Sequence, residues 1–252
     1  MSSDGTTAEQ AEMETRTIRD AIVEAALPHV PFDGWTMKMA AIAAEDAGYP
    51  RETADRVFPG GVSDILRHWS DLSDRTMLAE MAGRDLSAMG VRDRVAAALR
   101  VRIEVNAAHK EAVRRALSHL ALPQNATVAM GNTLRAVDAI WYAAGDTATD
   151  FSYYSKRALL TPVYVSSILY WIDDGSEEFA DTWAFIDRRL DDILRIPRFT
   201  SGLKRLFNPL SVVVRRRQAQ RLGAAATGLI KARARAAPAA AARGRRWPPQ
   251  RA

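Results

Sequence analysis

Few side chains in this chain have the types and spacings that catalysis requires. The histidines are His29, His68, His109 and His119, and none forms a close ligand pair at helical spacing with another histidine or a glutamate. The chain has no cysteine, which excludes thiolate catalysis, disulfides and cysteine-ligated metals. It also lacks a P-loop, a glycine-rich dinucleotide motif and a nucleophile elbow. We therefore predict a protein that is not an enzyme and has no cofactor and no metal site.

One segment combines acids, aromatic rings and a base at helical spacing. Asp150, Tyr153, Tyr154 and Arg157 lie at positions i, i+3, i+4 and i+7, so they share one helix face. Two interpretations stay open for it. The first is structural, with the rings in a core and the acid paired with the arginine. The second is a surface for a protein partner, since Tyr, Trp and Arg dominate interface hot spots. On the preceding predicted helix the same spacing joins Asp138, Trp141 and Tyr142.

The charges are divided unevenly along the chain. Asp192 is the last acidic residue, and the sixty residues after it, 193–252, contain fifteen Lys and Arg. Taking those fifteen from the 35 bases of the whole chain leaves 20 bases against 30 acids before residue 193, a net charge of −10. A basic end on an acidic body indicates a polyanionic partner, either a nucleic acid or an anionic membrane surface.

Residues 196–236 place apolar side chains at helical spacing beside bases such as Arg205 and Arg215. A helix with an apolar face and a basic face can lie in an anionic membrane surface. A helix that packs on its own domain and a tail that binds nucleic acid are the alternatives. We favour the membrane and expect no nucleic-acid partner. The predicted membrane-binding residues are Leu203, Leu206, Phe207, Leu210, Val213 and Val214.

The apolar pattern is helical along the chain, and no run alternates as a strand does. The prediction is an all-α bundle of about nine or ten helices. Residues 158–172 form the longest uncharged run, fifteen residues, which is too short to span a membrane and predicts a buried helix. Residues 177–194 form the most regular amphipathic stretch, suited to packing or dimerisation. Its apolar stripe is Phe179, Trp183, Ile186, Leu190 and Ile193.

Two sets of motifs resemble known families. Residues 34–48 and 57–66 look like the helix-turn-helix end of TetR-type regulators, but the recognition segment 51–57 has two acids against two bases and offers little to DNA. A longer set, in the same order over residues 17–195, resembles the ubiquinone-biosynthesis accessory family known as coenzyme Q nine. Its motifs are HVPFDGWT at 29–36, FPGG at 58–61, WY at 141–142, GD at 145–146, TDF at 149–151, and Phe179, Asp181, Thr182 and Trp183.

The second resemblance implies a TetR-like all-α fold with a degenerate helix-turn-helix part and a homodimer. It also implies binding of an isoprenoid lipid or ubiquinone precursor, without catalysis, and its presentation to a ubiquinone-pathway hydroxylase at an anionic membrane surface. A DNA-binding regulator is the alternative function. The partner-binding residues carried over from the resemblance are Asp138, Ile140, Trp141, Asp150, Tyr153 and Tyr154.

The lipid pocket is expected along the uncharged segment 158–172, with ordinary core packing as the alternative for each residue. The candidates are Leu159, Leu160, Val163, Ile168 and Leu169.

The expected domain organisation follows from these patterns. Residues 16–85 form the helix-turn-helix-like part, 86–195 the lipid-binding and dimerisation part, and 196–236 the basic membrane-binding segment. Residues 1–15 and 237–252 are expected to be disordered. The expected location is the cytoplasm of a bacterium, peripheral on the inner membrane.

Overall fold

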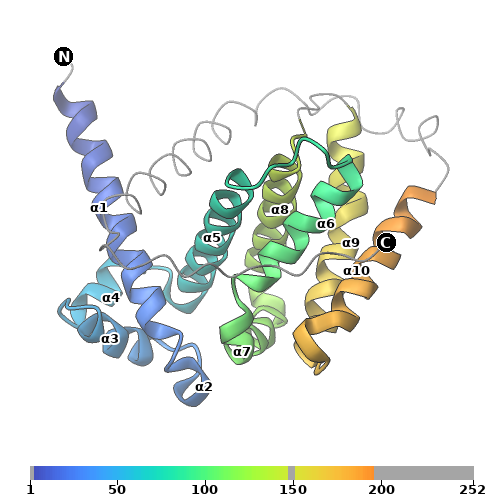
Figure 1. The fold of residues 1–252 in the computed structure, drawn as a ribbon. Coiled ribbons are helices and arrows are strands. Elements are labelled where there is room, and N and C mark those ends of the chain that lie inside the picture. The colour runs from blue at the N-terminus through green and yellow to red at the C-terminus, as the bar shows by residue number, and fades with distance from the viewer. Residues whose placement is uncertain (1–2, 147–150, 196–252) are drawn as a thin grey trace, which may run out of the picture. The chain divides into compact units, whose positions relative to one another are not determined.

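The computed structural model describes residues 3–146 and 151–195. All of them belong to one unit, Met1–Leu210, and the second unit, Ser211–Ala252, lies outside them. The described part has ten α-helices joined by short connections and no strand (Figure 1), which confirms the all-α prediction. The helices are α1 (Ser3–Ala26), α2 (Val30–Asp33), α3 (Met37–Asp46), α4 (Glu52–Val57), α5 (Gly61–Ala82), α6 (Val91–Glu104), α7 (Lys110–Leu120), α8 (Ala126–Ala143), α9 (Phe151–Asp173) and α10 (Ala180–Arg195).

The first four helices pack into one core with parts of α5 and α7. The hydroxyl of Thr36 caps α3 by accepting a hydrogen bond from the Met39 amide at 3.0 Å. Trp35 lies over Trp69 of α5, and its Nε1 donates to the Ala112 carbonyl of α7 at 3.0 Å. Ala112 and Ala116 belong to the same buried cluster as the α1 and α3 residues. The core therefore crosses the boundary expected near residue 85.

The expected disordered stretch 1–15 differs from the structure. Helix α1 begins at Ser3, so residues 3–15 extend a helix whose C-terminal part is anchored by the buried Ile22 and Val23. The sequence AEQAEM at 8–13 consists of good helix formers, and adding residues to an existing helix is favourable.

A buried ion-pair cluster fastens α1 to α5. The guanidinium of Arg75, 2% exposed, donates to both carboxylate oxygens of Asp20, at 2.6 and 3.0 Å, and to Asp71 at 2.9 Å. The ring of His68 also bonds to Asp20, at 2.7 Å. Burial alone would raise the pKa of Asp20, but the hydrogen bonds from His68 and Arg75 outweigh it and lower that pKa.

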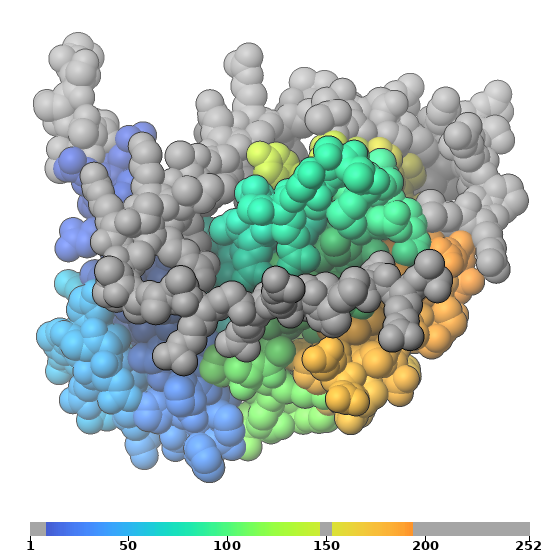
Figure 2. All heavy atoms as spheres, viewed as in Figure 1, coloured from blue at the N-terminus to red at the C-terminus, as the bar shows by residue number. Residues whose placement is uncertain are grey.

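The remaining helices pack side by side. Helix α8 contacts both α5 and α9, and α6 contacts α5 and α8. Helix α10 packs on α9 and α6, and Figure 2 shows α6 and α10 as neighbours on one face of the molecule. Ile186 and Leu190 of the amphipathic stripe are each 2% exposed. The stripe of α10 therefore packs within its own chain, the first of the two roles expected for it.

The predicted membrane-binding residues, Leu203, Leu206, Phe207, Leu210, Val213 and Val214, lie outside the described residues, as does the stretch 237–252. None of the described helices is long and apolar enough to cross a membrane.

Candidate functional site

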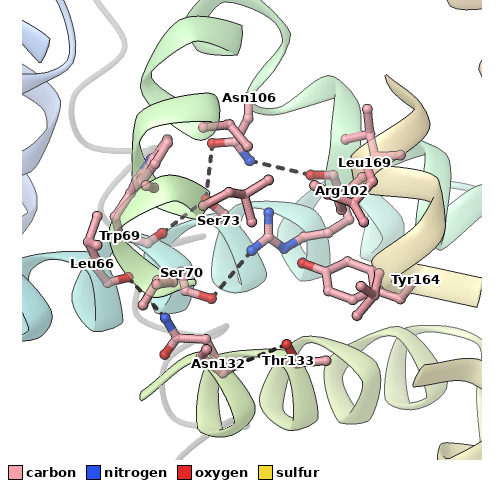
Figure 3. Close-up of a pocket in the computed structure, with 18 of the residues that line it drawn as sticks. Leu66, Trp69, Ser70, Ser73, Arg102, Asn106, Asn132, Thr133, Tyr164 and Leu169 are labelled. Atoms are coloured by element: carbon pink, nitrogen blue, oxygen red, sulfur yellow. Dashed lines mark hydrogen bonds between the residues drawn. The ribbon is translucent and has the colours of Figure 1, made fainter. Parts of the chain in front are cut away.

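A cavity of about 340 Å³ lies among α5, α6, α7, α8 and α9 (Figure 3). Small-molecule sites in proteins measure roughly 300–1,000 Å³, so the cavity has room for a ring or a few isoprene units. Most of its wall is apolar. The apolar part includes Leu66, Ile103, Val113, Leu117, Ile168 and Leu169.

Small side chains leave this volume open. Ala116 of α7, Ala121 at the end of α7 and Ala129 of α8 line the cavity. Protein interiors are otherwise packed as closely as organic crystals. A space of this size is therefore a feature that the sequence keeps open.

One side of the cavity carries a buried charge. Arg102 of α6 is 6% exposed, and its Nε donates to the Asp74 carboxylate of α5 at 2.6 Å. Asp74 is itself 3% exposed. Burial raises the pKa of Asp74, and the attraction of Arg102 offsets this only in part.

Two of the five predicted lipid-binding residues line the cavity. These are Ile168 and Leu169. Leu160 and Val163 are buried elsewhere in the core, at 0% and 4% exposure, and Leu159 is 40% exposed. Because residues 158–172 carry no charge on any side, the sequence does not show which face of this helix points inward.

Sequence reasoning missed the polar side of the cavity. Arg102, Asn106 and Tyr164 all line it. The sequence signal is an arginine between two apolar residues, Val101 and Ile103. The structure shows that all three are buried. A buried arginine needs a partner or a role.

The predicted partner-binding residues gather where α8 meets α9. The carboxylate of Asp138 accepts hydrogen bonds from Arg157 Nε at 2.7 Å and from the Tyr153 hydroxyl at 3.0 Å. Burial raises the pKa of Tyr153, and the neighbouring Asp138 raises it further. Arg157 also bonds to Asp146 at 3.2 Å, which in turn accepts from Lys156 at 2.7 Å.

These residues differ in what they expose. Tyr154 of α9 is 48% exposed and Tyr142 of α8 is 53% exposed. Trp141 is 9% exposed and donates to the Lys156 carbonyl at 3.2 Å. Ile140 is fully buried and could act on a partner only by positioning its neighbours. The sixth residue, Asp150, lies outside the described residues.

Two of the histidines in the described part bond to aspartates of neighbouring elements. His68 bonds to Asp20 and His29 to Asp46. Burial lowers the pKa of His109. Within residues 3–146 and 151–195, no group of three or more His, Asp or Glu side chains could hold a metal ion.

The chain was compared with protein families and with known proteins. The COQ9 family model, that of the coenzyme Q nine family, matches residues 126–197. The ubiquinone biosynthesis protein COQ9-B of Xenopus laevis is 30% identical over 201 residues, 75% of this chain and 67% of that protein. The chain belongs to the COQ9 family. This confirms the resemblance and assigns the chain to a family named for ubiquinone biosynthesis.

Other COQ9 proteins match at similar identity. The Drosophila melanogaster protein is 31% identical over 77% of this chain and 60% of its own length, and the human protein is 30% identical over 74% and 61%. The chain thus spans about three fifths of the length of these relatives.

A solved structure shows the same fold. The TetR transcriptional regulator from Nitrosomonas europaea superposes with a TM-score of 0.58 and 19% identity, over 71% of this chain and 98% of that one. The TetR-like fold is confirmed. At this identity the likeness concerns the fold alone. In the part that corresponds to a recognition segment, Arg51 pairs with Glu45 at 3.2 Å, and α4 carries Glu52 and Asp55.

The predicted location is contradicted. The Drosophila, Dictyostelium and human relatives are all named as mitochondrial proteins, which points away from the cytoplasmic face of a bacterial inner membrane. The prediction rested on composition, including the absence of cysteine. Composition reflects codon usage and redox chemistry, and it does not specify the compartment in which a protein works.

Proposed function

We propose that this COQ9-family chain is a non-catalytic accessory protein of ubiquinone biosynthesis that binds an isoprenoid quinone precursor. The cavity among α5–α9 is the observation that carries the proposal. Its apolar wall suits an isoprenoid, since each CH₂ group moved out of water contributes about 0.8 kcal/mol. Its small size suits the ring with the first part of the tail.

The surface around Tyr154 is the proposed docking site for a ubiquinone-pathway hydroxylase. Tyr154 offers an exposed ring there and contacts Tyr153, and the bonds from Arg157 and Tyr153 to Asp138 join α9 to α8. Rigid aromatic anchors over a fixed base are typical of interface hot spots. The proposed assembly is a homodimer that docks to an anionic membrane surface through residues 196–236.

Lipid extracted from the purified full chain and identified by mass spectrometry tests the binding. Ala129→Phe places a ring in the cavity, and we expect it to reduce bound isoprenoid at least about tenfold, because the space is lost. Ala126→Phe is the matched control, since Ala126 lies on the same helix, is exposed and does not line the cavity. Equal lipid in both variants would show that the lipid does not occupy this cavity.

Tyr154→Ala tests the docking site. We expect loss of hydroxylase association in a pull-down while bound lipid persists, because the Tyr154 ring is exposed and does not line the cavity. Tyr170→Ala is the control, an exposed tyrosine on the same helix. Association that survives Tyr154→Ala, or fails equally in the control, removes the assignment.

A further inference from the structure

The wall of the cavity is more polar than a site for a hydrocarbon requires. Ser73, Arg102, Asn106, Asn132 and Tyr164 line it, and each has less than a tenth of its surface exposed. Burying a polar group without a hydrogen-bond partner costs free energy. The groups that already have a hydrogen-bond partner in the protein are not available to a ligand. The groups that lack one are the donors that a ligand could use.

The amides and the serine bond to the protein itself. Asn106 accepts a hydrogen bond from the Ser73 hydroxyl at 3.3 Å and donates to the Arg102 carbonyl at 3.4 Å. Asn132 donates to a carbonyl of α5 at 3.5 Å and accepts from Arg135. Figure 3 shows the bonds between Ser73 and Asn106, between Asn106 and Arg102, and between Asn132 and Leu66. The side-chain amides of Asn106 and Asn132 are therefore already engaged in hydrogen bonds within the protein.

Three other groups on the wall have donors to spare. Of the five N–H donors of Arg102, Nε bonds to Asp74, and Nη2 makes only a long contact of 3.5 Å with the Ser70 hydroxyl. The Tyr164 hydroxyl points towards this guanidinium (Figure 3), and burial raises the pKa of Tyr164, so the hydroxyl keeps its proton. Trp171 also lines the cavity and is fully buried, and its Nε1 finds no acceptor among the described residues.

The charge of the wall narrows the class of ligand. Asp74 lies 2.6 Å from Arg102 and balances its charge. A multiply charged diphosphate would therefore enter a buried site without a free counter-charge, which is costly. Neutral oxygens that only accept hydrogen bonds, such as the carbonyl and methoxy oxygens of a quinone, match the spare N–H and O–H donors.

The mouth of the cavity is apolar. Val165 and Leu169 of α9 line the cavity and are also 39% and 56% exposed, so the space opens beside them. Ala121, at the end of α7, lines it and is exposed too. A prenyl tail that leaves the cavity meets hydrocarbon at this point.

We propose that Arg102, Tyr164 and Trp171 form a subsite for the oxygen-bearing ring of a neutral prenylated quinone, which enters ring first; this rests on the proposed function. The tail then leaves past Val165 and Leu169. Tyr164 and Trp171 are two turns apart on the same side of α9, about 10 Å along its axis.

A competition experiment tests the subsite. The purified full chain is incubated with equal amounts of a two-isoprene ubiquinone, the corresponding two-isoprene hydrocarbon and geranyl diphosphate, and the retained ligands are quantified by mass spectrometry after gel filtration. We expect the quinone to exceed the hydrocarbon about tenfold or more. Tyr164→Phe and Trp171→Phe should each reduce this ratio about fivefold, the effect of one hydrogen bond, and leave hydrocarbon binding unchanged. Tyr170→Phe is the control that should keep the wild-type ratio, since Tyr170 lies on α9 and does not line the cavity.

Each outcome separates the two proposals. Quinone and hydrocarbon retained equally by the wild-type chain would overturn the subsite and leave lipid binding standing. A preference for the diphosphate would overturn the neutral-ring assignment in the same way. A wild-type chain that retains none of the three ligands would overturn the proposed function as well.

Discussion

The protein contains two buried arginine–aspartate clusters that differ in how fully they are bonded. In the cluster of α1 and α5, Arg75 makes three short bonds to two carboxylates, and Asp20 receives a further bond from His68. In the cluster at the cavity, Arg102 makes one short bond, to Asp74. The pKa of Asp20 is accordingly lowered, whereas burial raises that of Asp74. We infer that the fully bonded cluster holds α1 and α5 together. The cluster at the cavity leaves N–H donors of Arg102 available to a ligand.

The largest effect is expected from Arg75→Met. It leaves Asp20 charged and partly buried, and breaking a buried pair from one side costs about 3–5 kcal/mol. Urea unfolding measures this as a lower free energy of unfolding. The control is Arg67→Met, since Arg67 is 48% exposed and its bridge to Asp64 contributes about 1 kcal/mol or less. If Arg75→Met lowered the free energy of unfolding no more than the control does, the cluster would not stabilise the packing of α1 on α5.

Replacing each aspartate by asparagine sharpens the comparison through pH. The pKa of Asp20 is lower in the folded than in the unfolded chain, so its ionised form adds stability above pH about 4, and this is lost on acidification. Asp20→Asn should thus cost about 1–3 kcal/mol at pH 7 and less at low pH. The pKa of Asp74 is raised by burial, so the folded state resists its ionisation as the pH rises.

Asp74→Asn leaves the buried Arg102 without its counter-charge, so it should also lower the free energy of unfolding at pH 7, by about 1–3 kcal/mol. Urea unfolding curves recorded from pH 3 to pH 7 give the difference in free energy of unfolding between each variant and wild type. The pH dependence of this difference is the quantity to compare. If this difference changed with pH in the same direction for both variants, the distinction between the two clusters would be contradicted.

A smaller effect is expected at the third donor of the cavity. Trp171→Phe removes a buried N–H that has no acceptor among the described residues, and an unsatisfied buried donor costs about 1–3 kcal/mol. Loss of ring volume offsets part of the gain. The lipid-free variant should therefore unfold at a free energy up to about 1 kcal/mol higher than wild type in urea. A clear loss of stability would mean that the indole serves packing alone.

Local patterns predicted the helices well because each depends on a short stretch of sequence. Thr36 caps α3 where the sequence changes from a loop to an amphipathic run. The helical pattern does not mark every break, since the structure divides residues 91–120 into α6, a 3₁₀ turn and α7. Sequence spacing also placed Tyr153 and Arg157 on one helix face, because residues three and four apart share a face. Only the structure brings Asp138 of the preceding helix to them.

The sequence by itself determined the helical class, the uneven charge and the family, since periodicity, composition and ordered motifs are properties of the chain alone. Only the tertiary structure decided which residues surround the cavity. Ile168 lines it and Leu160 does not, although both belong to the uncharged run 158–172 of α9. Arg102 reaches it from α6, and its partner Asp74 comes from α5. The physical reason is that a cavity forms where five helices fail to fill the space between them, and no single helix carries that information.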